Sequence, residues 1–156
     1  MYANNGNYVV RIEDFAHRHY IKLFNKKYKK AWDITEQAIL RELERVDRLL
    51  GFTDKAEKIS VANGCCLIKL NFKIAGTNIS AKSSGNRAIV LVDHTSFVCK
   101  ILLVYSKNEI SPPNETQKWM NDIKLNYPAI WKMFHNKQRR CQEIIKCFRH
   151  YRLPIS

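Results

Sequence analysis

Residues 66–73 read CLIKLNFK, and this alternation indicates the fold class of the chain. One set of alternate positions carries Cys66, Ile68, Leu70 and Phe72, and the other carries Leu67, Lys69, Asn71 and Lys73. Successive side chains of a β-strand point to opposite faces of the sheet. The stretch therefore predicts a strand with one apolar face and one wet, basic face.

Further strands are predicted on the C-terminal side of this stretch. A turn at residues 76–78 and the small residues of KSSGN, 82–86, precede an apolar strand at about 87–92. A hairpin turn at 93–96 then leads into a strand at 97–105, whose alternate positions are apolar on both faces apart from Lys100. Burial on both faces is typical of a strand in the middle of a sheet.

On the N-terminal side, residues 8–12 predict a short strand and residues 15–32 one amphipathic helix. Asp33 or Thr35 is placed to cap a second helix, which we expect to continue until Gly51. The two helices should form a hairpin. The sequence thus predicts an α+β fold in which this helix hairpin packs on a four-stranded antiparallel sheet.

The C-terminal part of the chain is predicted to be helical. A breaker cluster at 111–114 precedes a helix to about residue 127, and Pro128 separates it from a last helix to about residue 151. This last helix has an apolar stripe and a cationic remainder that includes Arg139 and Arg140. We divide the chain into a main domain, 1–127, and an extra basic helical extension, 128–156.

The charge of the chain indicates an anionic partner. The sequence has 27 Lys and Arg against 14 Asp and Glu, a formal net charge of +13 over 156 residues. Such an imbalance attracts nucleic acid or anionic lipid, and we favour RNA. One alternative is that the basic surface binds an acidic protein partner. For the lysine-rich face of the first helix and for the basic tail, the other alternative is a surface that is merely solvated.

Nothing in the sequence indicates export or a membrane. Residues 1–8 are polar, and the longest apolar run, 101–105, is too short to cross a bilayer. An odd number of cysteines lacks the spacing of a disulfide framework: Cys65, Cys66, Cys99, Cys141 and Cys147. We expect reduced, buried thiols in a cytoplasmic protein, with neither a metal site nor a cofactor. The five histidines are scattered and are interpreted as ordinary.

Three short runs resemble the RelE-type toxins of bacterial toxin–antitoxin pairs. They are LIKLNF at 67–72, AKSSGNRAIV at 81–90 and LLVYSKNE at 102–109. Those toxins carry K-L-R-F, G-K-S-G-G-x-R-V-I and I-Y-S-K-S-E in the same order and on the same strands. The resemblance spans residues 15–110, and it identifies residues 1–127 as a RelE-like toxin domain.

The resemblance implies an activity: metal-independent cutting of mRNA in the ribosomal A site, neutralised by a cognate antitoxin. In such cleavage the RNA 2′-hydroxyl attacks the neighbouring phosphate, and cations stabilise the charge that develops there. Position by position, the implied catalytic residues are Lys82, which binds phosphate or transfers a proton, Arg87, which stabilises the transition state, and Lys107. The implied RNA-binding residues are Lys69, Lys73, Lys100, Arg139 and Arg140.

Two other residues of these runs have alternative interpretations. Tyr105 either stacks on a base or, as alternation favours, belongs to the core. Glu109 either acts as a base or caps the end of a strand. For Lys82 and Arg87 the alternative is a solvent-exposed turn without a catalytic role.

Departures from the family pattern leave rival functions open. Asn71 replaces a common arginine, and Ser84, Gly85 and Asn86 stand where the family has two glycines and the residue after them. A non-catalytic RNA-binding or ribosome-binding module is therefore one alternative, and a gyrase-poisoning toxin of the same superfamily is another. The C-terminal extension binds ribosomal RNA, covers the site or packs on the partner.

Overall fold

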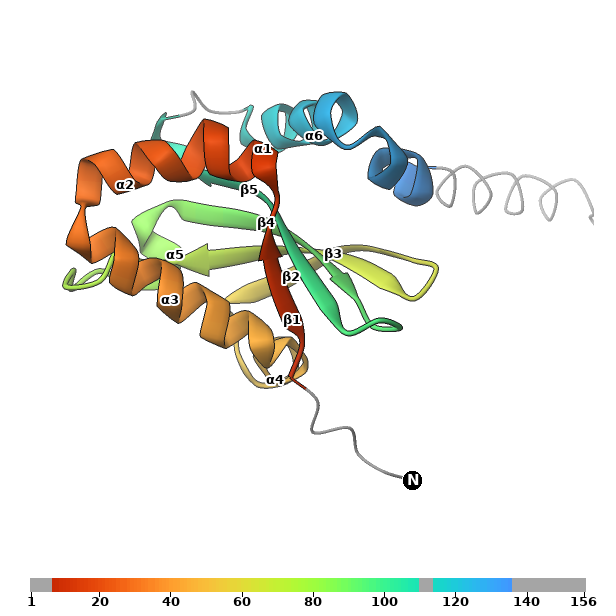
Figure 1. Ribbon diagram of the computed structural model, residues 1–156, viewed down its shortest axis with the longest axis horizontal. Coiled ribbons are helices and arrows are strands. Elements are labelled where there is room, and N and C mark those ends of the chain that lie inside the picture. The colour runs from red at the N-terminus through yellow and green to blue at the C-terminus, as the bar shows by residue number, and fades with distance from the viewer. Residues whose placement is uncertain (1–6, 110–113, 136–156) are drawn as a thin grey trace, which may run out of the picture.

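The computed structural model describes residues 7–109 and 114–135, and Figure 1 shows how their elements are arranged. The strands are β1 (Val9–Ile12), β2 (Ala56–Ala62), β3 (Cys65–Phe72), β4 (Asn86–Asp93) and β5 (Val98–Ser106). The helices are α1 (Asp14–Ala16), the π-helical η1 (His17–Ile21), α2 (Lys22–Tyr28), α3 (Lys30–Glu44), α4 (Val46–Phe52), α5 (Ala81–Ser84), the 3-10 helix η2 (Lys107–Glu109) and α6 (Glu115–Asn126). Residues 128–135 are also helical.

The sheet has five strands in the order β1-β5-β4-β3-β2. Strands β2 to β5 pair antiparallel, and β1 pairs parallel to β5, with Val9 beside Val98. The α+β prediction is confirmed, whereas the four-stranded antiparallel sheet is wrong. Strand β2, an edge strand with mixed polar and apolar residues, was not predicted, and no local pattern reveals that β1 runs parallel to a strand almost 90 residues later.

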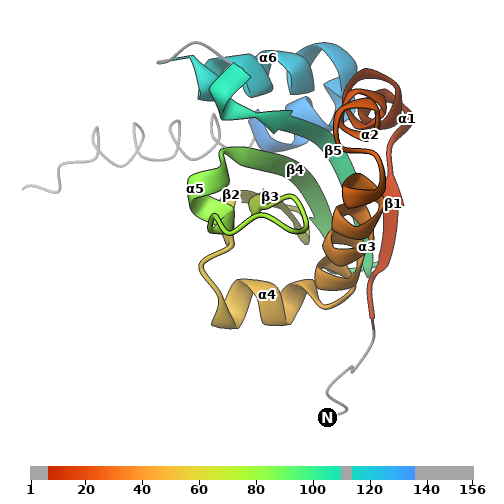
Figure 2. The same cartoon turned by 90° about the vertical axis from the view of Figure 1, so that its left-hand side faces the viewer.

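Both faces of the sheet are covered. Helices α2, α3 and α4 lie on one side, and α6 and the helix 128–135 lie on the other (Figures 1 and 2). In β3 the side chains of Ile68 and Leu70 enter the first core and that of Leu67 enters the second. The prediction of a wet face at Leu67 is therefore wrong at that end of β3. Strand β5 lies between two strands and is buried on both faces, as predicted.

The helix hairpin breaks at different residues from those predicted. Lys29, at φ 51° and ψ −121°, separates α2 from α3, so the first helix does not continue to Trp32. Trp32 is 1% exposed and packs against Phe24 and Phe72, which requires it to lie inside α3 facing the sheet. A second break falls at residue 45, and Gly51 lies within α4 rather than ending a helix.

Thr35 is not the predicted cap. Its hydroxyl donates to the carbonyl of Ala31 within α3 at 2.7 Å and accepts from the backbone N–H of Ala75 at 2.9 Å. The hydroxyl therefore ties α3 to the segment that follows β3. Because buried polar groups cost free energy unless they are hydrogen-bonded, this contact explains how a threonine that is 2% exposed is tolerated.

The proposed division at residue 128 stays a prediction. The described part of the last helix packs on the second core through Phe134, which is 8% exposed. Arg139 and Arg140 lie outside the described residues. Within those residues, no helix combines the length and apolar character needed to span a bilayer.

Truncation of Leu43 to alanine should test the first core. Leu43 has no exposed surface and packs between α3 and the sheet, so Leu43→Ala should lower the free energy of unfolding by about 2–5 kcal/mol. Leu125→Ala is the control, because Leu125 on α6 is 77% exposed and its truncation should change stability by less than about 0.5 kcal/mol. Urea unfolding of both variants measures the difference. Equal destabilisation would contradict this assignment of the core.

Candidate functional site

A short turn at one end of the sheet carries the first predicted site residues. Helix α5 begins after Ser80, whose side chain accepts from the N–H of Ser83 at 3.2 Å, and ends at Gly85, at φ 78°. The Ser84 hydroxyl lies 2.6 Å from the carbonyl of Phe72 and accepts from the N–H of Asn86 at 3.1 Å. These contacts fasten the turn to the end of β3. The backbone from which the exposed Lys82 side chain projects is therefore held in place.

The end of β5 docks directly on this turn. The Lys107 N–H donates to the carbonyl of Gly85 at 2.8 Å, and the Asn108 side-chain amide donates to the carbonyl of Ser84 at 3.3 Å. A Cβ atom built on Gly85 would lie 2.7 Å from that amide nitrogen. The positive φ favours glycine here, and a larger residue would displace the Asn108 side chain. The exposed residue Lys107 is thereby held beside the turn that carries Lys82.

Arg87 is buried beneath the same turn, with 5% of its surface exposed. Its Nη1 donates to the carbonyl of Asn86 at 2.9 Å and its Nη2 donates to that of Lys82 at 2.9 Å; the carbonyl of Ala81 lies 3.5 Å from Nη1. The guanidinium group therefore faces backbone carbonyls and not solvent. This differs from the direct phosphate contact that the resemblance implied, and it makes Arg87 a brace for the turn.

The remaining predicted cations are spread over the sheet. Lys73 is exposed just after β3, which ends opposite Asn86, and so lies near the α5 turn. Lys69 is half-buried, and its ammonium group lies 3.7 Å from the carboxylate of Glu57. Lys100 pairs with Leu91 toward the other end of β5, roughly 20 Å along the strand from residue 107. The structure thus gathers Lys73, Lys82, Arg87 and Lys107 at one end and leaves Lys100 apart.

Helix α6 covers the face on which RNA contacts were predicted. Tyr105 is 7% exposed, and its hydroxyl donates to the Glu115 carboxylate at 2.8 Å. Burial, and then this carboxylate, raise the pKa of Tyr105 well above its usual value. Trp119 and Ile123 of α6 join the same core. Of the two interpretations of Tyr105, the structure favours the core tyrosine.

Glu109 lies at the surface of η2, and its carboxylate is 3.6 Å from the ammonium group of Lys27. The side chain of Lys27 is 61% exposed and that of Glu109 is 69% exposed. Solvent-exposed ion pairs of this kind contribute little to stability. Glu109 therefore fits the interpretation of a residue at the end of a strand, and its contact links α2 to η2.

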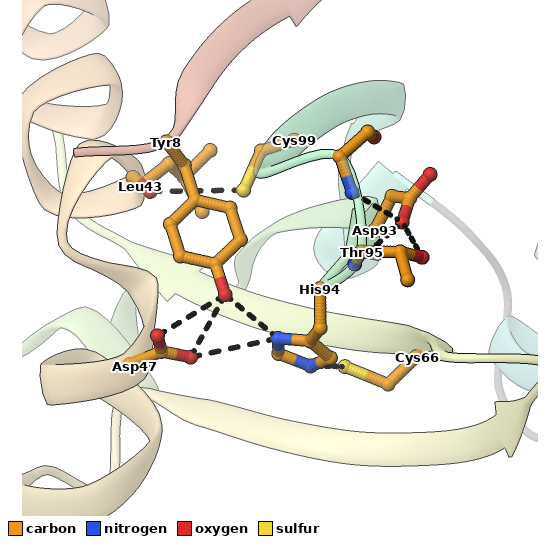
Figure 3. Close-up of polar contacts among 9 residues, drawn as sticks. Tyr8, Leu43, Asp47, Cys66, Asp93, His94, Thr95 and Cys99 are labelled. Atoms are coloured by element: carbon orange, nitrogen blue, oxygen red, sulfur yellow. Dashed lines mark hydrogen bonds and ion pairs between the residues drawn. The ribbon is translucent and has the colours of Figure 1, made fainter. Parts of the chain in front are cut away.

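A second polar cluster, drawn in Figure 3, lies at the opposite end of the sheet, where Cys66 of β3 pairs with Val92 of β4. The Tyr8 hydroxyl is 2.8 Å from Nδ1 of His94 and 3.1 Å from the nearer carboxylate oxygen of Asp47. Nε2 of His94 is 3.4 Å from the sulfur of Cys66. The cluster joins the residue before β1, helix α4, strand β3 and the 93–97 turn. His94 was interpreted as ordinary, but its partners are up to 86 positions away in sequence, and no local pattern could reveal them.

Cys66, His94 and Asp47 form a row of thiol, imidazole and carboxylate, but the thiol of Cys66 is not reactive. Cys66 is 1% exposed and burial raises its pKa, whereas a nucleophilic cysteine needs a lowered pKa and access. Burial likewise raises the pKa of Cys99 to about 12. The prediction of buried thiols is confirmed for Cys65, Cys66 and Cys99; Cys141 and Cys147 lie outside the described residues. Across residues 7–109 and 114–135, no group of three or more His, Cys, Asp and Glu could hold a metal ion.

Comparison with known proteins gives one distant similarity. No family model matches the chain, and no curated protein matches it. Among solved structures, it is similar to an archaeal RelE–RelB complex from Pyrococcus horikoshii OT3, at 17% sequence identity and a TM-score of 0.47. The match covers 65% of this chain and 96% of the other. A likeness this distant does not assign a fold family or a function.

The brace formed by Arg87 can be tested by stability. Arg87→Lys removes the fork that holds two carbonyls, so it should lower the free energy of unfolding by about 1.5–3 kcal/mol. Lys82→Ala, on the exposed surface of the same turn, should change it by less than about 0.5 kcal/mol. Urea unfolding monitored by circular dichroism compares them. Equal stability of Arg87→Lys and the unmodified chain would contradict the bracing role.

The 93–97 turn makes a pH-dependent contribution to stability. The Asp93 carboxylate accepts from the N–H and hydroxyl of Thr95, at 2.9 and 2.7 Å, and from the N–H of Ser96 at 3.1 Å. These bonds hold the pKa of Asp93 well below its usual range. A carboxyl group whose pKa is lowered by folding stabilises the fold fully when the pH is above its pKa in the unfolded chain, about 3.9. This stabilisation is lost as the pH falls through the pKa of the group in the folded chain.

Asp93→Asn removes this ionisation. Unfolding of the variant and of the unmodified chain, measured from pH 7 to pH 2, should show a stability difference that is largest near neutral pH and narrows below pH 4. Asp54→Asn, in the exposed loop before β2, is the matched control and should show a smaller change with pH. A difference for Asp93→Asn that is constant down to pH 2 would show that its carboxylate is not the source.

Proposed function

We propose that this chain is an RNA-cutting toxin: a metal-independent endoribonuclease that cleaves mRNA on the ribosome and is neutralised by an antitoxin. The observation that carries the proposal is the docking of the Lys107 segment on the Gly85 turn, which holds two exposed lysines of the motif runs at one end of the sheet. The net charge of +13 supports a polyanionic substrate.

The proposed chemistry needs cations near one phosphate. The RNA 2′-oxygen forms a bond to phosphorus and gives its proton to water. The bond from phosphorus to the 5′-oxygen breaks, and that oxygen takes a proton from the ammonium group of Lys82, which regains one from solvent. The products are a 2′,3′-cyclic phosphate and a 5′-hydroxyl end. In this proposal Lys82 and Lys107 stabilise the added negative charge, and electrostatic stabilisation of this kind is often the largest single contribution to catalysis. Lys82 also serves as a candidate for proton transfer.

Arg87 takes a positioning role in this proposal. Its guanidinium group donates to the carbonyl of Lys82 and thereby sets where the lysine side chain starts. Small displacements of a catalytic group cost rate, so a braced turn matters for chemistry even when the brace does not touch substrate. Lys73 is placed to contact the RNA backbone next to the site, and Lys69 is placed farther along the same face.

A second function, RNA or ribosome binding without cleavage, is supported by one specific observation. The N–H groups of Arg87 are engaged with carbonyls, and its cross-strand neighbour is Asn71, where the family commonly has arginine. Fewer positive charges then face the phosphate than the resemblance implies. In this alternative, Lys82 and Lys107 bind the RNA backbone and no bond is cut.

The antitoxin and the compartment belong to the proposal as well. A strongly cationic toxin calls for a partner with acidic side chains, because complementary charge speeds association and selects the partner. The mRNA and the ribosome place the activity in the cytoplasm.

Induced expression tests the proposed function. The unmodified chain and Lys82→Ala/Lys107→Ala are expressed, and cuts in a translated message are mapped by primer extension. The unmodified chain should arrest growth and cut within codons. Cleavage by the double variant should be at least about tenfold lower, because removal of one such charged contact commonly lowers the rate by that factor or more. The matched control is Lys22→Ala/Lys58→Ala, which removes the same charge from exposed positions on α2 and β2.

Other outcomes separate the alternatives. Equal cutting by the two double variants would contradict the placement of the site. Absence of cuts and of arrest, together with RNA binding that weakens steeply with salt and depends on Lys82 and Lys107, would support the non-catalytic module. Growth arrest without cuts would favour poisoning of gyrase.

A further inference from the structure

A cavity of about 220 Å³ lies between α2, the end of β5 and α6. Its wall is strongly aromatic, formed by Tyr20, Phe24, Tyr28 and Tyr105. Tyr20, Phe24 and Tyr28 are half-buried, so they are held in place by packing but keep part of their surface accessible. Helix geometry places residues 20, 24 and 28 on one face of the helical segment, because they are four positions apart.

Polar groups surround this aromatic wall. Ser106 and Glu109 line the cavity from the end of β5 and η2, and Lys27 and Lys118 line it from α2 and α6. The ammonium group of Lys27 lies 5.2 Å from the centroid of the Tyr28 ring. A flat aromatic ligand would find rings to stack on and polar groups for its edge, and a phosphate attached to it would find lysines nearby.

The wall on the α6 side is fixed by hydrogen bonds. The Tyr20 hydroxyl donates to the Asp122 carboxylate at 2.8 Å, and the ammonium group of Lys118 lies 3.6 Å from the same carboxylate. Burial, and then the bond to Asp122, raise the pKa of Tyr20 above its usual value, so the phenol stays neutral. The contact between Tyr20 and Asp122 therefore holds the α6 side of the cavity against η1.

The cavity adjoins the proposed site. Ser106 lines the cavity and is the cross-strand partner of Asn86, which follows the α5 turn. Lys107 comes next in the chain and donates to Gly85 of that turn. A nucleotide whose phosphate lies on Lys82 and Lys107 thus has an aromatic cavity within reach of its base.

We propose that this cavity binds one nucleobase of a single-stranded RNA, next to the phosphate held by Lys82 and Lys107. The location of that phosphate rests on the proposed function; the base-binding property rests on the cavity. A volume of 220 Å³ is below the range typical of pockets for drug-sized ligands, which suits a single base better than a larger cofactor. Stacking on aromatic side chains accepts any base, so we expect weak preference among the four.

Binding of fluorescein-labelled oligomers tests the inference without measuring cleavage. The probes are a ribouridine hexamer and an abasic ribose-phosphate hexamer of the same charge. The unmodified chain should bind the ribouridine hexamer more tightly than the abasic one, since only the former offers a base. Tyr28→Leu should weaken binding of ribouridine by roughly tenfold and leave binding of the abasic oligomer unchanged.

Two controls accompany this variant. Tyr28→Phe keeps the ring and should bind like the unmodified chain. Phe52→Leu removes an aromatic ring that is 84% exposed on α4, away from the cavity, and should also have no effect. Circular dichroism of each variant checks that the fold is retained. If Tyr28→Leu unfolds the chain, Tyr28→Met, whose longer and flexible side chain fills more of the space of the ring without offering a face for stacking, takes its place and should weaken ribouridine binding alone.

The outcomes distinguish this inference from the proposed function. Equal affinity of the unmodified chain for both hexamers, or unchanged ribouridine binding by the cavity variant, would overturn the base site. Weaker RNA binding by Lys82→Ala/Lys107→Ala, together with unchanged binding by Tyr28→Leu, would support the phosphate site and contradict the base site. The reverse pattern would support the base site and overturn the placement of the phosphate.

Discussion

The register of three neighbouring strands positions the candidate site. In the antiparallel ladders, Phe72 of β3 lies opposite Asn86 of β4, which lies opposite Ser106 of β5. The three strand ends therefore align, and the segments that follow β3, precede β4 and follow β5 meet at one edge of the sheet. A shift of one residue would turn every alternating side chain to the other face. Burial on both faces forbids such a shift, so packing of the core fixes the positions of the lysines near this edge.

The difference between the expected and observed site lies in where the positive charge is exposed. The resemblance implied a row of cations across an open face of the sheet. In the structure α6 packs on that face, Tyr105 is bonded to Glu115, and Arg87 points into backbone carbonyls. The exposed charge of the motif runs is concentrated instead in the α5 turn and in η2. The proposed RNA would accordingly approach this end of the sheet and not the face that α6 covers.

Local sequence patterns predicted the elements whose side chains alternate or repeat regularly. The strands near residues 66–73, 87–92 and 97–105 were found in this way, and so was the helical character of most of residues 15–50, but not the predicted division into two helices. The breaks at Lys29 and Arg45, the mixed-polarity strand β2 and the parallel pairing of β1 depend on contacts between distant residues, such as Trp32 with Phe72. The convergence of Lys82 and Lys107 came from motif order. The burial of Arg87 depends on how the α5 turn folds over it, and the aromatic cavity depends on how α2 and α6 pack; periodicity encodes neither.

The two edges of the sheet bear on how the chain behaves at high concentration. An open edge strand offers unpaired N–H and C=O groups to another molecule and invites aggregation. Here β1 is only four residues long, and β2 carries the exposed charges Glu57 and Lys58 together with a register irregularity between Lys58 and Ser60. Short length, charge and a bulge are the devices by which natural sheets resist edge-to-edge stacking. The two edge strands thus discourage copies of the chain from adding to one another's sheets.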